Sequence, residues 1–216
     1  MILRFYKEMG SWLRIKASRL FLLSLALFIT AEVLGHLYFV AHPVMAQKAI
    51  VQLKEILAQK INLEARGWEL FIQILYNNLR AGMLLFLFGL IPFLFIPVIG
   101  IAANGLQMGL VSSISMIQGK AASRIFLFGI LPHGIIEIPA FLLAGSLGLH
   151  LSIQILKKIF RPQQTSLFDP RQASPPFTDI LKQTFMAWAA VVFPLLIAAA
   201  LIEAFLTPIL IETFLK

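Results

Sequence analysis

Long apolar runs separated by short polar stretches set the pattern of this 216-residue chain. A helix needs about 20 apolar residues to cross roughly 30 Å of hydrocarbon. The pattern therefore predicts an all-α, polytopic integral membrane helical bundle with five to six transmembrane helices. The expected full spans cover residues 20–40, 71–95, 98–118, 135–156 and 180–206.

The polar stretches between these runs differ in character. Residues 1–19 alternate basic and aromatic positions, which predicts a basic interfacial N-terminal helix. Residues 43–70 form an amphipathic extracytoplasmic segment with a helix expected over about 44–62. Residues 157–180 are basic and rich in Pro, Gln and Ser, which indicates a flexible cytoplasmic loop. We expect residues 1–216 to form a single membrane domain.

The run at 125–156 is too long for one straight span and too short for a two-span hairpin. Pro132 and Pro139 lie inside it, and each removes a backbone donor. We therefore expect a half-helix to about residue 131, a helix break at Pro132-His133-Gly134, and a full span after it. Non-helical backbone at membrane depth survives only when it is buried in protein or lines water. If the half-helix re-enters, the chain has five full spans, and the alternative is six.

Small residues recur at four-residue spacing in two of the spans. They are Gly105 and Gly109 in the third, and Ala140, Ala144 and Gly148 in the fourth. Such spacing lets helix backbones approach closely in lipid, so we expect both sets to mark helix-packing faces.

Composition supports the membrane assignment and excludes other classes. Hydrophobic residues make up 59% of the chain and charged residues only 13%, against about 45–50% and 25% in soluble domains. A soluble globular enzyme is excluded, and the net charge of +8 is better explained by loops and lipid headgroups than by nucleic acid. With no Cys, disulfides and thiolate sites are excluded as well.

The distribution of Lys and Arg predicts the orientation. Segments 1–19 and 157–182 hold five each, whereas 43–70 and 118–124 hold four and two. The positive-inside rule then places the N-terminus in the cytoplasm and the C-terminus outside, in the cytoplasmic (inner) membrane.

Ionisable residues inside the spans are the main functional clue, since each costs about 2.5–3.5 kcal/mol at mid-membrane on insertion scales. They and one amide are Glu32, His36, Arg80, Asn104, His133, Glu137, His150 and Glu203. We interpret Arg80 either as an interfacial, snorkelling group or as the counter-charge to Glu137 or Glu203.

Two His/Glu pairs, Glu32 with His36 and His133 with Glu137, are spaced i, i+4 and so share a helix face. Three roles stay open. The pairs could be buried hydrogen-bonded contacts, or a proton- or ion-coupled site in a transporter. They could also form a metal site in which His133, Glu137, Glu32 and His36 bind Zn, Fe or Mn. No other cofactor is expected.

Several motifs together point to a family. They are Asn77-Asn78-Leu79-Arg80, Asn104-Gly105 with Gly109, the string from Leu131-Pro132-His133-Gly134 to Pro139-Ala140, and Glu203-Ala204-Phe205. The chain resembles the stage II sporulation protein M family, in its wider, non-sporulation branch. The resemblance implies a polytopic inner-membrane protein. In endospore formers the name-giving member acts in engulfment beside peptidoglycan-degrading partners.

Three functions follow. The first is a non-enzymatic scaffold that recruits partners to a membrane or envelope complex. The second is a transporter or channel for a small or lipidic substrate that uses the His/Glu pairs. The third is an intramembrane metalloenzyme, although the chain lacks P-loop, GxSxG and HExxH motifs. Expected partners are the lipid bilayer, a second copy in a homodimer and envelope proteins, but no nucleic acid. A cavity that reaches His133 and Glu137 would favour transport, and a closed pair would favour the scaffold.

Overall fold

The computed structural model describes residues 10, 13, 17–60, 62, 64–160 and 176–214. Over these residues it is a helical bundle with five helices long and apolar enough to cross a membrane, which confirms the predicted fold class. The spans are α2 (Ser18–Ala41), α4 (Gly67–Leu87) with the 3₁₀ turn η1 (Phe88–Leu90), α5 (Ile96–Ile117), Ser123–Phe160, and Phe177–Phe214.

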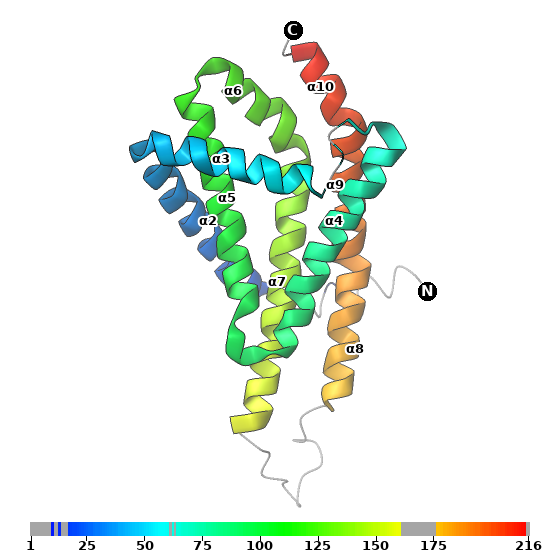
Figure 1. Cartoon of the computed structure of the whole chain (residues 1–216). Coiled ribbons are helices and arrows are strands. Elements are labelled where there is room, and N and C mark those ends of the chain that lie inside the picture. Colours follow the sequence, from blue (N-terminus) through cyan, green and yellow to red (C-terminus); the bar gives the residue numbers. More distant parts are fainter. Residues whose placement is uncertain are drawn as a thin grey trace, which may run out of the picture.

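The two ends of the bundle are built differently (Figure 1). Near one end, helix α3 (Pro43–Ala58) runs crosswise along the outside of the bundle, and α6 (Lys120–Ile125) and α10 (Thr207–Phe214) extend beyond it. The bounds of α3 are close to those of the predicted amphipathic helix, and its exposed residues include Val44 and Val51. At the other end α4 turns into α5 through η1 and η2 (Pro92–Leu94), a stretch without charged residues. The second span therefore ends earlier than residue 95.

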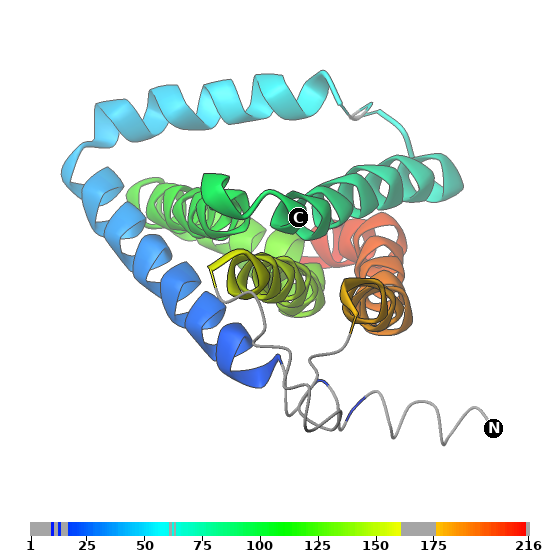
Figure 2. The ribbon, with the colours of Figure 1, turned by 90° about the horizontal axis from the view of Figure 1, so that it is seen from below.

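Helix α7 (Leu131–Phe160) is central in the bundle and packs against α2, α4, α5 and α9 (Phe193–Leu201). Figure 2 shows α2 and α3 along the outside of the molecule, with α5 and α7 within. Its central position makes α7 the element on which a buried site can be built.

The predicted break at Pro132–Gly134 is wrong, and so is the re-entrant half-helix. The chain is helical from α6 (Lys120–Ile125) through η3 (Phe126–Ile130) into α7, and the irregularity is the π-helical turn η3. Pro132 lacks an N–H, and its ring would clash with the carbonyl four residues earlier, at Phe128. The wider π turn accommodates both effects without interrupting the helix.

The last span uses the same arrangement twice. A π turn precedes Pro194 and another precedes Pro208, each proline being the second residue of the α-helix that follows. The elements in order are α8 (Phe177–Ala187), η5 (Trp188–Val192), α9, η6 (Ile202–Leu206) and α10 (Thr207–Phe214). Pro139, by contrast, lies inside α7 without such a turn.

The predicted flexible loop at 157–180 is shorter at both ends, because α7 continues to Phe160 and α8 begins at Phe177. Residues 161–175 lie outside the described part of the chain, as does most of the predicted interfacial helix at 1–19.

Both predicted small-residue faces pack as expected. A Cβ on Gly105 would come within 2.5 Å of the Phe28 carbonyl of α2, and one on Gly109 would overlap the Glu32 carbonyl. On α7, Ala140, Ala144 and Gly148 are all buried. Close backbone contact of this kind is what holds helices together in lipid.

Candidate intramembrane binding site

The polar centre of the molecule contains one histidine and two glutamates. His133 and Glu137 lie on α7, and Glu203 lies in the π turn η6 of the last span. One potential ligand atom from each residue lies within 4.8 Å of the others. The Nε2 atom of His133 and the Oε2 atom of Glu203 are 3.8 Å apart. We call these three residues the triad.

Two local features bring the triad together. His133 and Glu137 are one helical turn apart, so both side chains leave the same face of α7. Glu203 reaches this face because the last span packs along α7, with η6 in contact with it. All three side chains are partly buried, and Glu203 is 31% exposed.

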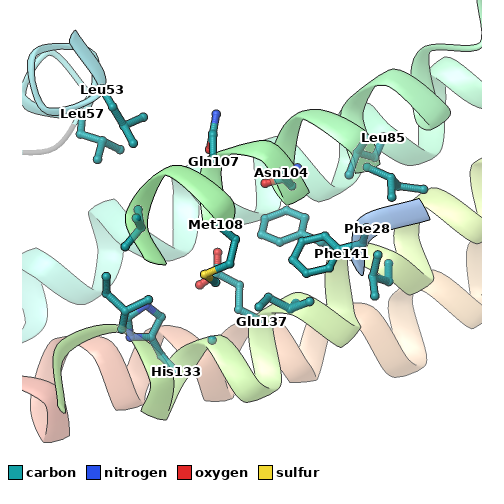
Figure 3. A pocket seen from close by; sticks show the side chains of 16 residues that line it. Phe28, Leu53, Leu57, Leu85, Asn104, Gln107, Met108, His133, Glu137 and Phe141 are labelled. Atoms are coloured by element: carbon teal, nitrogen blue, oxygen red, sulfur yellow. The ribbon is translucent and has the colours of Figure 1, made fainter. Parts of the chain in front are cut away.

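A cavity of about 270 Å³ reaches His133 and Glu137 from the α5 side. Figure 3 shows both side chains pointing from α7 toward Met108 of α5, with Leu53 and Leu57 of α3 nearby. Asn104 and Gln107 add polar groups to the α5 wall, and the rest of the lining is mainly apolar. The lining also includes Phe28, Leu85, Ile101, Val111, Ile130, Gly134, Ile138, Phe141 and Leu142. A cavity of this size has room for several water molecules or a hydrated ion.

A second cavity, of about 730 Å³, lies on the Glu203 side of the triad. Arg66 and Glu212 contribute to its lining, and Leu57 lines both cavities. The triad therefore lies between two cavities, with His133 and Glu137 facing one and Glu203 facing the other.

The protein itself leaves polar atoms of this region unpaired. Within the described residues, the buried Nδ1 atom of His133 and the buried Oγ1 atom of Thr207 have no hydrogen-bond partner. The 3.8 Å separation of His133 and Glu203 is too long for a direct hydrogen bond. Buried polar groups are normally satisfied, so this arrangement fits a site that takes up a polar ligand.

The other predicted pair, Glu32 with His36, lies at the contact between α2 and α5 and not in the triad. Ser112 of α5 lies between its members, donating to Glu32 Oε1 at 3.2 Å and contacting His36 Nδ1 at 2.8 Å. This is a hydrogen-bonded helix contact between α2 and α5. The four-residue metal set proposed from the sequence is therefore wrong, since Glu203 rather than Glu32 or His36 joins His133 and Glu137.

The remaining predicted residues lie in three different places: the cavity, the surface and the core. Asn104 lines the cavity and donates to the Gly100 carbonyl of its own helix at 2.9 Å. Arg80 is exposed on α4 and forms no ion pair with any described residue, so the counter-charge interpretation is wrong. His150 is buried in α7.

Sequence reasoning missed Ser112 and Gln107. A signal was available, because Asn104, Gln107 and Val111 recur at helical spacing and all three line the cavity. Ser112 gave no such signal, since its role depends on how α2 packs.

The comparisons with known proteins agree with the fold. The model of the stage II sporulation protein M family matches residues 24–208. The chain belongs to this family. This stage II sporulation protein M family member is similar in sequence to an uncharacterized protein of the archaeon Methanocaldococcus jannaschii. It is 31% identical over 139 residues, which are 64% of this chain and 71% of the archaeal protein. No solved structure matches. The resemblance seen in the motifs is confirmed, and this family member is a multi-pass membrane protein.

Proposed function

We propose that this protein is a transporter that moves a small cation through the membrane by way of the triad. The observation that carries the proposal is the cavity that reaches His133 and Glu137, with Glu203 within 4.8 Å of both on the side of a second cavity. Ionisable residues at this depth normally mark ion paths or proton relays. The triad then has a binding role and not a catalytic one.

Charge favours a cation as the substrate. Two carboxylates lie close together in a mainly apolar surrounding, where their negative charge is poorly solvated. The triad could take the cation from one cavity and release it to the other, because Glu203 faces a different cavity from Glu137. If the start of α2 lies on the cytoplasmic side, the end of the bundle near α3 lies on the opposite side of the membrane.

A flux assay in proteoliposomes tests the proposal. Liposomes containing either a trapped pH dye or a trapped Mn²⁺-quenched dye report the entry of protons or Mn²⁺. The wild-type chain should carry at least one of these cations, and both Glu137→Gln and Glu203→Gln should abolish the flux. Glu32→Gln is the matched control, because it changes a glutamate in a span but outside the cavity.

Flux that equals that of protein-free liposomes for both cations contradicts the proposal. Flux that is unchanged in both triad variants also contradicts it.

A scaffold role is the second candidate, and one observation favours it. Trp68, Ile72, Tyr76, Arg80 and Leu84 follow one another at four-residue spacing on α4, and all are exposed. We call these five residues the α4 outer stripe. Arg80 is twelve residues after Trp68, about 18 Å along the helix, and so lies near the middle of the span. A charge there is costly unless another molecule supplies a partner.

Site-directed cross-linking tests this role, because the chain contains no native Cys. Tyr76→Cys in native membranes should give a cross-linked species that Arg80→Leu removes. A dimer band would identify a second copy as the partner. Only monomer at native expression would rule out a scaffold that uses this stripe.

A further inference from the structure

We infer that the triad binds a divalent transition-metal ion such as Zn²⁺, Mn²⁺ or Fe²⁺. The inference rests on the proposed function and specifies the cation. Among the described residues, His133, Glu137 and Glu203 form the only group of three or more potential metal ligands whose ligand atoms lie within 4.8 Å of one another.

The spacing of the triad is close to that of a coordination sphere. Ligand atoms at about 2.0–2.2 Å from a metal ion lie roughly 3.0–3.6 Å from each other. The observed values are 3.8 Å between His133 and Glu203 and at most 4.8 Å across the triad. A contraction of about 1 Å would close the site. Changes of side-chain torsion in Glu137 and Glu203 can supply it, because both glutamates border cavities.

Charge balance favours a divalent ion over a monovalent one. When both are ionised, Glu137 and Glu203 carry two negative charges, and a neutral imidazole adds none. No Lys or Arg among the described residues forms an ion pair with either carboxylate, although Arg66 lines the second cavity. A divalent ion would cancel both charges in a medium where an uncompensated charge is expensive.

The ligand types narrow the choice of ion further. An imidazole nitrogen with carboxylate oxygens suits Zn, Fe and Mn. Ca²⁺ and Mg²⁺ prefer oxygen ligands throughout. Soft ions such as Cu(I) prefer thiolates, and the chain has no Cys. The cavity beside the triad leaves room for water or substrate groups to complete the coordination.

The binding test uses the full chain in detergent after removal of metals with a chelator. Zn²⁺ binding is measured by calorimetry, and Co²⁺ serves as a second probe through its visible absorption spectrum. We expect one ion per chain. Changing a group that only hydrogen-bonds to a metal ligand weakens metal binding by roughly 10–100-fold. His133→Asn, Glu137→Gln and Glu203→Gln each remove a ligand and should therefore weaken Zn²⁺ binding by more than this.

Glu32→Gln is again the control and should bind Zn²⁺ like the wild type. Gel filtration and thermal unfolding show whether each variant is folded, so a loss of binding in a folded variant is interpretable. The inference is overturned if no stoichiometric Zn²⁺ or Co²⁺ binds. It is equally overturned if the three triad variants bind as tightly as the control.

The two proposals fail in different ways. Metal binding that depends on the triad, without flux of any cation in liposomes, keeps the metal site and removes transport. Proton flux that depends on Glu137, without metal binding, keeps transport and overturns the metal site.

Discussion

Gly89 of η1 and Gly148 of α7 meet backbone to backbone. The approach is so close that a Cβ on Gly89 would overlap the Gly148 carbonyl, and a Cβ on Gly148 would overlap the Leu85 carbonyl. The hydroxyl of Ser152 donates to the Gly89 carbonyl at 2.8 Å, one turn further along α7. This contact fixes the end of α4 and the embedded turn against the central helix.

Gly89→Ala should therefore destabilise the fold. The atoms in its way belong to the backbone and cannot move aside, and overpacking of this kind costs about 1–3 kcal/mol. The apparent Tm in detergent should fall. Gly134→Ala is the control, because the nearest atom to its new Cβ is Ile138 Cδ1 at 3.9 Å. An alanine in a helix is favoured over glycine by up to about 1 kcal/mol, so this variant should be neutral or more stable. Equal behaviour of the two variants would contradict the packing described for Gly89.

Ser112→Ala should loosen the contact between α2 and α5. It removes the hydroxyl that lies between the partly buried side chains of Glu32 and His36. An unsatisfied polar group costs about 1–3 kcal/mol when it is buried, so we expect a loss of about 1 kcal/mol here. Ser113→Ala is the matched control, because Ser113 donates only to the Leu110 carbonyl of its own helix among the described residues. Thermal unfolding should show a clearly larger drop for Ser112→Ala, and a similar drop in both would count against the bridge.

Leu57 should limit access to the first cavity. It belongs to α3, which runs crosswise along the outside of the bundle near one end, and it lines both cavities. A Met108→Cys variant should react with a small membrane-impermeant thiol reagent, and adding Leu57→Ala should accelerate the reaction. Met116→Cys, on the same helix but exposed and outside the cavity, is the control and should keep its rate. If both rates rise together, Leu57 affects the whole helix and not the cavity.

Arg80→Leu should ease the insertion of α4 into the membrane. On insertion scales an arginine at the centre of a span costs about 2.5–3.5 kcal/mol, and Leu is favourable. An insertion reporter fused to the α4 segment should show a higher inserted fraction. Cation flux should not change, because Arg80 is exposed and lines neither cavity. A loss of flux in a folded Arg80→Leu protein would place Arg80 in the transport path.

Sequence patterns predicted the spans well because burial in lipid demands length and apolarity alone. Helix α2 and helix α5 begin and end within about two residues of the expected bounds. The small-residue faces were predictable for the same local reason, since a four-residue spacing defines a helix face. These properties need no knowledge of neighbouring helices.

The site was less predictable because it depends on contacts between helices. Glu32–His36 and His133–Glu137 have identical spacing, and only the neighbours distinguish them: Ser112 for the first pair and Glu203 for the second. The approach of Glu203 could not be predicted from periodicity. The last span contains two π turns, and each shifts the faces that follow it by about one residue, or roughly 100°. A proline predicts a departure from α-geometry, but not whether it is a break or a wide turn.

The position of Glu203 inside the wide turn η6 has a mechanical consequence. If the turn moved along the helix from one side of Glu203 to the other, the carboxylate would swing by about 100° around the helix axis. The flanking helices α9 and α10 would keep their packing, and only a few backbone hydrogen bonds would exchange partners. Glu203, which already borders the second cavity, would then move away from His133 without any rigid-body movement of the spans.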